Sequence, residues 1–286
     1  MKRIFKHPIG IVLAILIMVP MLIGTYAVFI EPARLVVRHV EIPTDDQSIQ
    51  EIRLAIVSDL HVGSPLNGLD KLERVVSALN EEEPDLILLL GDFLISRVRG
   101  GAHVEPGQIG EGLAALSAPL GDYSVLGNHD WWEDGKGMQA ALEANGISVL
   151  ENTSLLFNWQ GQDFYLVGLA DDSTRRPSLA TAYDEVPEGA PSIVMTHDPA
   201  AFLELPAIYR PELLLAGHTH GGQIYLPWLF DPIVPGRAGP EWAAGLVYVG
   251  GIPLFVTSGV GTSILPIRFN RPPEIVILTL HLPAET

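Results

Sequence analysis

The chain has 286 residues, of which 48% are hydrophobic and 18% charged, and this composition excludes a disordered chain. It contains no cysteine, which excludes disulfides, thiolate metal sites and cysteine nucleophiles, so any metal must be held by histidine and oxygen ligands. Residues 1–40 hold five of the 17 basic and one of the 34 acidic side chains, which leaves a net charge of −21 on the remainder. A domain this acidic repels a phosphate backbone, so we expect no nucleic-acid binding.

The chain begins with a basic tail, residues 1–8, followed by an uncharged apolar run, residues 9–30. At about 1.5 Å per residue, this run is long enough to cross a hydrocarbon core of about 30 Å, and it predicts a single transmembrane helix. The alternative is a cleaved signal peptide with a small-residue site at residues 24–27. The apolar core of a signal peptide is typically shorter, about 7–15 residues, which favours an uncleaved anchor.

The charges beside the apolar run bear on its orientation in a bacterial inner membrane. Lys2, Arg3, Lys6 and the amino terminus precede the run, whereas Arg34 and Arg38 follow it. By a small margin, this excess favours a cytoplasmic tail and an external catalytic domain.

After the anchor we expect a juxtamembrane connector over residues 31–50, with one strand-like patch, and a single domain over residues 51–286. Short runs rich in Val, Ile and Leu in this domain are typical of strands buried on both faces. Helices are predicted over residues 69–84 and 138–146, and a hairpin over residues 154–170. Alternation of strands and helices, followed by a strand-rich C-terminal part, predicts an α/β fold with two packed sheets and helices outside.

Side chains with metal-binding chemistry follow the ends of five predicted strands, where ligands bind in open α/β sheets. Each alone has an ordinary explanation, such as a helix cap or a turn. Together they exceed what one tetrahedral ion needs and suit two ions about 3.5–4 Å apart that share a carboxylate. Carboxylate and imidazole without sulfur suit Mn, Fe or Zn. The residues are Asp59, His61, Asp92, Asn128, His129, His197, His218 and His220.

Five motifs in chain order resemble those of the calcineurin-like metallophosphoesterases, namely DLH at 59–61, GD at 91–92, GNHD at 127–130, TH at 196–197 and GHTHGG at 217–222. The basic tail, the apolar anchor and the C-terminal segment are similar to a bacterial membrane-associated phosphodiesterase branch that includes UDP-2,3-diacylglucosamine pyrophosphatase-like proteins. The resemblance spans about residues 52–280. It implies a four-layer α/β/β/α sandwich of two mixed sheets.

The resemblance also implies two divalent metal ions, for which we favour manganese, with Asp92 as the bridging ligand. Such ions would activate a water as hydroxide for attack on phosphorus. His129 would donate a proton to the leaving group or stabilise charge on the phosphoryl oxygens. The other ligands would be Asp59, His61 and His220 for the first ion, and Asn128, His197 and His218 for the second.

One position departs from the family pattern. Many relatives continue GD as GDxxD, and the second aspartate orients the catalytic histidine, but here that position is Ile95. We expect Asp130 or a backbone carbonyl to orient His129 instead.

Four arginines near the predicted site are candidates for binding a second phosphate, because the guanidinium binds phosphate oxygens bidentately. Ordinary solvated loop residues are the alternative. The apolar stretch at residues 224–236 is suited to an acyl-chain groove, to contact with the bilayer or to core packing. The four arginines are Arg97, Arg99, Arg175 and Arg176.

These features favour a phosphodiesterase or pyrophosphatase that acts on a lipid-linked substrate such as UDP-2,3-diacylglucosamine. A lipid A precursor would require a cytoplasmic domain, against the charge bias. The alternatives are a broad phosphomonoesterase, a cyclic-nucleotide phosphodiesterase, a nuclease, and a non-catalytic scaffold of the same fold. The presence of every expected ligand argues against the scaffold, and the acidic domain argues against the nuclease.

Overall fold

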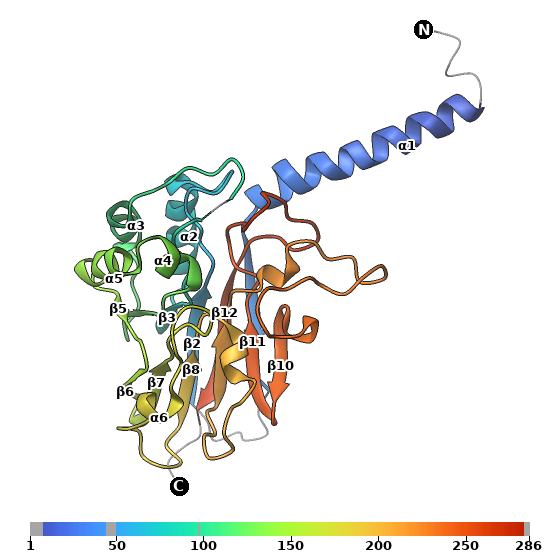
Figure 1. Cartoon of the computed structure of the whole chain (residues 1–286). Coiled ribbons are helices and arrows are strands. Elements are labelled where there is room, and N and C mark those ends of the chain that lie inside the picture. Colours follow the sequence, from blue (N-terminus) through green and yellow to red (C-terminus); the bar gives the residue numbers. More distant parts are fainter. Residues whose placement is uncertain (1–7, 44–49, 97, 283–286) are drawn as a thin grey trace.

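Two six-stranded sheets pack face to face in the computed structural model, which describes residues 8–43, 50–96 and 98–282 (Figure 1). Both sheets are mixed, because β1 and β12 run antiparallel to the rest of the first sheet and β6 and β10 antiparallel to the rest of the second. The first sheet has the order β1 (Val36–Glu41), β12 (Glu274–Leu282), β2 (Gln50–Val57), β3 (Leu86–Leu89), β4 (Asp122–Ser124) and β5 (Ser148–Val149). The second has the order β10 (Gly245–Val249), β11 (Ile252–Val256), β9 (Leu213–Ala216), β8 (Ser192–Met195), β7 (Gln162–Gly168) and β6 (Thr153–Trp159).

Helices cover the outer faces of the sheets and complete the expected α/β/β/α layering. The predicted helices over residues 69–84 and 138–146 correspond to α2 and α5, and the predicted hairpin is β6 with β7. The bounds are α2 (Leu69–Glu81), α3 (Pro106–Leu113), α4 (Asn128–Glu133), α5 (Gly135–Ala144) and α6 (Leu179–Ala182). Short 3-10 turns are η4 (Pro199–Phe202), η5 (His220–Gly222) and η6 (Pro240–Trp242).

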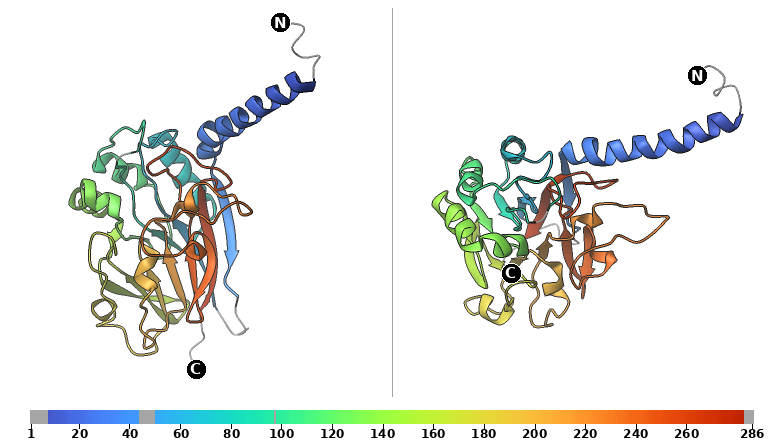
Figure 2. Two further views of the ribbon diagram at one scale, coloured as in Figure 1. Left: turned by 45° about the vertical axis from the view of Figure 1, so that its right-hand side comes forward. Right: turned by 45° about the horizontal axis from the view of Figure 1, so that its top comes forward.

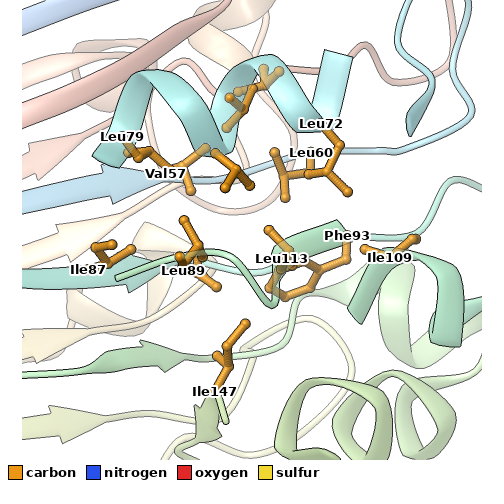
Figure 3. Packing of buried hydrophobic residues seen from close by; sticks show 14 of the residues in the cluster. Val57, Leu60, Leu72, Leu79, Ile87, Leu89, Phe93, Ile109, Leu113 and Ile147 are labelled. Atoms are coloured by element: carbon orange, nitrogen blue, oxygen red, sulfur yellow. The ribbon is translucent and has the colours of Figure 1, made fainter. Parts of the chain in front are cut away.

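Alternation along the central strands places hydrophobic side chains in the layers on both sides of a sheet. In β2, Ala55 and Val57 pack in the cluster beneath the helices, whereas Leu54 and Ile56 pack in the cluster between the sheets. Figure 3 shows the cluster beneath the helices, where side chains of α2 and α3 meet the outer faces of β2 and β3. Burial on both faces explains why these strands are continuous apolar runs.

The N-terminal segment forms a long helix that projects from the domain (Figures 1 and 2). It consists of α1 (Pro8–Thr25), the π-helical η2 (Tyr26–Ile30) and the 3-10 turn η3 (Glu31–Ala33). The stretch Ile9–Ala33 is apolar and long enough to cross a membrane, as the sequence predicts for residues 9–30.

The segment predicted as a connector contributes a strand to the first sheet. β1 pairs in parallel with β12, with Val36 opposite Glu274 and Glu41 opposite Thr279. The sheet therefore begins before residue 51, because the strand-like patch finds a partner at the far end of the sequence.

Candidate metal centre

The predicted ligands gather at one edge of the sandwich, where strands of both sheets end. Asp59 and His61 follow β2, Asp92 follows β3, and Asn128 begins α4 just after β4. The second sheet contributes the remaining ligands, because His197 follows β8 and His218 and His220 follow β9. All are buried. The parallel direction of β2 with β3 and of β8 with β9 brings these residues to the same edge.

The ligands expected for the first ion face one another. His61 Nε2 lies 3.1 Å from His220 Nε2, and Asp59 Oδ1 lies 3.3 Å from that same His220 atom. His61 Nδ1 bonds to the carbonyl of Leu94 at 2.9 Å. When Nδ1 donates to that carbonyl, the lone pair of Nε2 points toward the carboxylate, as a metal ligand requires.

The second group has the same arrangement. His197 Nε2 lies 3.2 Å from His218 Nδ1 and 3.2 Å from Asp92 Oδ2. His197 Nδ1 bonds to the carbonyl of Leu90 at 2.6 Å, which directs Nε2 to the centre of the group. Asn128, expected as the third ligand of this group, lines the same pocket as His218 and has a buried side-chain oxygen.

Asp92 connects the two groups through a single oxygen. Its Oδ2 lies 3.2 Å from His197 Nε2 and 3.5 Å from His61 Nε2, whereas Oδ1 accepts the backbone N–H of His129 at 2.8 Å. Burial raises the pKa of this carboxyl, but the nearby histidines outweigh burial and hold it well below the ordinary value. Asp92 is therefore an anion in the position expected for a bridging ligand.

Unpaired buried atoms show that these residues fit two cations. Asp59 Oδ1 and Asn128 Oδ1 are buried without a hydrogen-bond partner in the described part of the chain. Two imidazole nitrogens about 2.1 Å from a shared ion lie about 3.0–3.4 Å apart, which matches the two histidine pairs. Three groups with the spacing of a metal site occur here: Asp59–His61–His220, His61–Asp92–His129 and Asp92–His197–His218.

His129 lies beside the predicted ligands, and Ser96 is its orienting partner. Ser96 Oγ is 2.8 Å from His129 Nδ1, and the opposite ring atom, Nε2, is 3.4 Å from Ser263 Oγ. Burial lowers the pKa of His129 to about 4, so the ring is neutral at neutral pH. A hydrogen bond donated by Ser96 would place the ring proton on Nε2.

Asp130 does not orient His129, because its carboxylate is committed to the backbone. It accepts the N–H groups of Asp92, Phe93, Leu94 and Gly127 at 2.8–3.0 Å. Burial raises the pKa of Asp130 to about 7, and the charge of Asp92 adds to that effect. Asp130 thus holds the loop after β3 against the start of α4. The residue that contacts His129 is Ser96, one position after Ile95.

Two further supporting residues were not predicted from the sequence. Asp198 Oδ2 lies 3.7 Å from His218 Nε2, the ring atom that faces away from His197. Arg268 is fully buried, and its Nη2 lies 3.4 Å from His220 Nδ1 while donating to the carbonyls of Ser258 and Gly261. In the sequence, the position of Asp198 next to His197 is the only indication that it supports the site. No neighbouring motif in the sequence indicates that Arg268 does so.

None of the three described arginines among the four predicted substrate residues lines the pocket, but the backbone N–H of Arg99 donates to the carbonyl of Ile264, which does line it. Arg175 pairs with Glu151 at 2.6 Å and stacks its guanidinium 4.3 Å from the ring centre of Trp131. Arg99 and Arg176 are exposed. Arg97 lies outside the described residues.

A pocket of about 440 Å³ opens directly over the metal-binding groups. One wall contains predicted ligands together with His129 and Ser96, and the other is apolar. The polar wall includes Asp92, Asn128, His218 and His220, and the apolar wall includes Trp132, Ile233, Val234, Pro235 and Ile264.

The family model for calcineurin-like phosphoesterases matches residues 52–222, the segment that carries all five motifs. The chain belongs to this family. It is therefore a metallophosphoesterase, a class of hydrolase that uses divalent metal ions.

Curated relatives extend this likeness over most of the chain. The metallophosphoesterase YkuE of Bacillus subtilis is 32% identical over 225 residues, covering 78% of this chain and 77% of YkuE. The phosphodiesterase YaeI of Escherichia coli is 28% identical, covering 80% and 82%. The UDP-2,3-diacylglucosamine pyrophosphatase LpxG of Chlamydia trachomatis is 27% identical over 319 residues, covering 91% and 93%.

Proposed function

We propose that this protein is a membrane-anchored, binuclear-metal phosphodiesterase that cleaves a phosphodiester or pyrophosphate bond of a lipid-linked substrate such as UDP-2,3-diacylglucosamine. The observation that carries the proposal is the pocket, which is lined both by predicted metal ligands and by apolar side chains. Such a pocket suits a substrate with a phosphate beside an acyl chain. The alignment with LpxG over 91% of the chain supports the same substrate class.

Each polar residue has a distinct part in the proposed reaction. Bound divalent ions supply Lewis-acid activation of water and of the phosphoryl group. Asp92 would be the ligand shared by both ions, because it lies between the two histidine groups. His129, neutral and oriented by Ser96, directs its Nε2–H at the phosphoryl or leaving oxygen and stabilises the charge that develops there. Carboxylate, amide and imidazole ligands suit Mn, Fe or Zn, and among these we favour manganese.

The first experiment measures UMP release from UDP-2,3-diacylglucosamine in detergent with added Mn²⁺, with a soluble synthetic diester as control. Release of UMP supports the proposed substrate and a cytoplasmic catalytic domain. Diester cleavage without UMP release would keep the chemistry and reject this substrate. An external envelope phosphodiester, consistent with the basic residues before α1, would then be the better candidate.

A comparison of monoesters, diesters and cyclic nucleotides tests the alternative activities. The apolar pocket wall predicts that diesters with an apolar substituent are cleaved faster than simple monoesters. Faster cleavage of monoesters or cyclic nucleotides would favour a broad phosphatase or a cyclic-nucleotide phosphodiesterase. Absence of bound metal together with absence of activity would favour a non-catalytic scaffold.

A further inference from the structure

A rigid junction, rather than a flexible linker, joins the N-terminal helix to the catalytic domain. The carbonyl of Ala27 accepts the N–H of Arg268 at 3.0 Å, and Lys71 Nζ donates to the carbonyl of Pro32 at 2.7 Å. Ala27, Glu31 and Pro32 are buried in the domain. The end of the anchor is thus part of the folded domain.

The exposed part of the anchor is close in length to the thickness of a bilayer's hydrocarbon core. α1 contains 18 residues and is about 27 Å long at about 1.5 Å per residue, whereas a hydrocarbon core is about 30 Å thick. Most of its side chains are exposed, and from Ile9 onward the first buried residue is Ala27. If α1 spans the membrane, the bilayer surface must therefore lie against the domain.

Two loops of the domain carry exposed apolar side chains. The loop after η5 exposes Trp228 (85%), Leu229 (71%) and Ile233 (80%), and the loop before Arg268 exposes Ile264 (72%). We call these four residues, together with Phe230 and Leu265, the apolar rim.

Backbone contacts connect the rim to the anchor. Gln223 joins the two loops, because its Oε1 accepts the N–H of Ser263 at 2.6 Å and its backbone carbonyl accepts the N–H of Phe269 at 2.9 Å. Phe269 follows Arg268, which bonds to Ala27. The loop after η5 and α1 extend from the domain in the same general direction in all three views (Figures 1 and 2).

We propose that the apolar rim contacts the bilayer that holds α1 and opens the metal pocket onto the membrane surface. Ile233 and Ile264 belong to both the rim and the pocket wall, so the rim connects directly to the pocket that contains the predicted ligands. Contact with the bilayer would let a lipid present its phosphate to the ligands while its acyl chains stay in the membrane. This last step rests on the proposed function, whereas the contact itself does not.

The chemistry of the rim predicts apolar rather than electrostatic contact. Tryptophan is enriched at membrane interfaces, and Asp231 is the only charged residue in the segment 224–236. The acidic domain also lacks the basic charge that would attract anionic lipids. Zwitterionic phosphatidylcholine should therefore be sufficient for contact.

Single-cysteine labelling of the full-length protein tests the contact directly, because the chain has no native cysteine. A fluorophore on Trp228→Cys is compared with one on Ile208→Cys in phosphatidylcholine vesicles that carry a nitroxide near the headgroup end of the acyl chain. Ile208 is a matched control because it is 78% exposed and precedes the amino end of β9, opposite the ligand edge. We expect about twofold quenching at position 228 and little at 208. Equal quenching at both positions, or none at 228, would overturn the proposal.

A kinetic experiment separates this inference from the proposed function. The double variant Trp228→Ser/Leu229→Ser changes exposed residues that do not line the pocket. It should cleave a soluble diester like the wild type but a vesicle-embedded lipid substrate about tenfold more slowly, because apolar burial in the membrane is lost. Ile208→Ser should affect neither rate. Unchanged cleavage of the embedded lipid by the double variant would overturn the proposed contact between the apolar rim and the bilayer. Failure of the wild type to cleave that lipid would instead reject the proposed substrate class.

Discussion

Five residues of the candidate metal centre have a left-handed backbone, which non-glycine residues rarely adopt. The φ angles are 52° at Asp59, 40° at His61, 57° at Asp92, 68° at His218 and 52° at His220. Each such conformation costs on the order of 1–3 kcal/mol and persists where the surrounding structure enforces it. At these positions the left-handed backbone turns the chain sharply just after a strand ends, and the turn directs neighbouring side chains into one site.

The roles of Asp92 and His129 predict opposite outcomes for two alanine variants. Asp92→Ala should lose both metal ions and reduce turnover by more than about 10³-fold, because the bridging oxygen is removed. His129→Ala should keep both ions and turn over about 10²-fold more slowly or less. Elemental analysis of purified variants, together with turnover of a soluble diester, measures both effects. Loss of metal from His129→Ala and its retention by Asp92→Ala would contradict the assigned roles.

Ser96 is predicted to act through His129 as a positioning residue. Ser96→Ala should lower kcat about three- to tenfold with little change in KM, because an unsupported ring spends less time correctly aligned. Metal content should stay unchanged. Ser96→Thr retains the hydroxyl and should recover much of the lost rate. A change in KM alone would assign Ser96 to substrate binding instead.

At the residue scale, what the sequence could predict depends on how far apart the partners lie along the chain. The structure brings the predicted ligands together because each follows a strand that is recognisable by itself. The sequence did not predict Ser96, because the family pattern places the partner of His129 at position 95, where Ile95 led us to expect Asp130 or a backbone carbonyl instead. Arg268 lies 48 positions from its contact His220 and is recognised only in three dimensions.

At the scale of elements, the loop between β11 and β12 links the anchor to the first group of ligands. Gly259 and Gly261 pack against Asp59 and His61 so closely that an added Cβ would lie 2.6 Å from the Cβ of the respective ligand. Val260, between them, accepts a hydrogen bond from Lys71 through its carbonyl at 3.4 Å. The same lysine also donates to the carbonyl of Pro32 at the end of the N-terminal helix. Lys71 therefore contacts both the junction and the loop that packs against the ligands.

Lys71 should make the stability of the protein depend on pH. Burial lowers its pKa to about 7, and the positive charges of Arg268 and Arg74 add to that effect. The unfolded chain binds this proton more tightly between about pH 7 and 10.5, so stability should rise with pH across that window. Relative to Lys71→Met, the wild type should gain roughly 1 kcal/mol per pH unit, or about 2–4 °C in Tm. Thermal unfolding in detergent from pH 7.5 to 9.5 measures this difference, and parallel curves for the two proteins would contradict it.

Elements with strong local patterns were predictable, and those that depend on distant partners were not. Leucine and valine at helical spacing predicted α2, and the turn at Gly161 predicted the β6–β7 hairpin. β1 was expected only as a patch in a connector, because its partner β12 lies more than 200 residues later in the chain. Local pattern cannot show that such a strand joins a sheet.

At the scale of the whole molecule, the metal centre joins the two sheets, since ligands come from strands of both. Removal of the ions should therefore lower overall stability as well as activity. Each ion contributes about 2.7 kcal/mol at 100 times its Kd, so chelation should lower Tm by about 10 °C or more. Thermal unfolding with EDTA, and again after Mn²⁺ is restored, measures this effect. The Tm of Asp92→Ala should change much less on addition of EDTA, because this variant is expected to lack the ions. An unchanged wild-type Tm would argue against structural coupling of the two sheets through the ions.

The rigid junction at Ala27 and Pro32 has a consequence for the membrane itself. A catalytic domain on a flexible tether can sample many heights above a bilayer, but if α1 spans the membrane, this domain would be held at the height that α1 sets. Because α1 is close in length to the hydrocarbon core, hydrophobic mismatch in a thicker or thinner bilayer would change the tilt of the helix and the position of the domain. Bilayer thickness would thereby affect how the metal centre is positioned relative to the membrane surface.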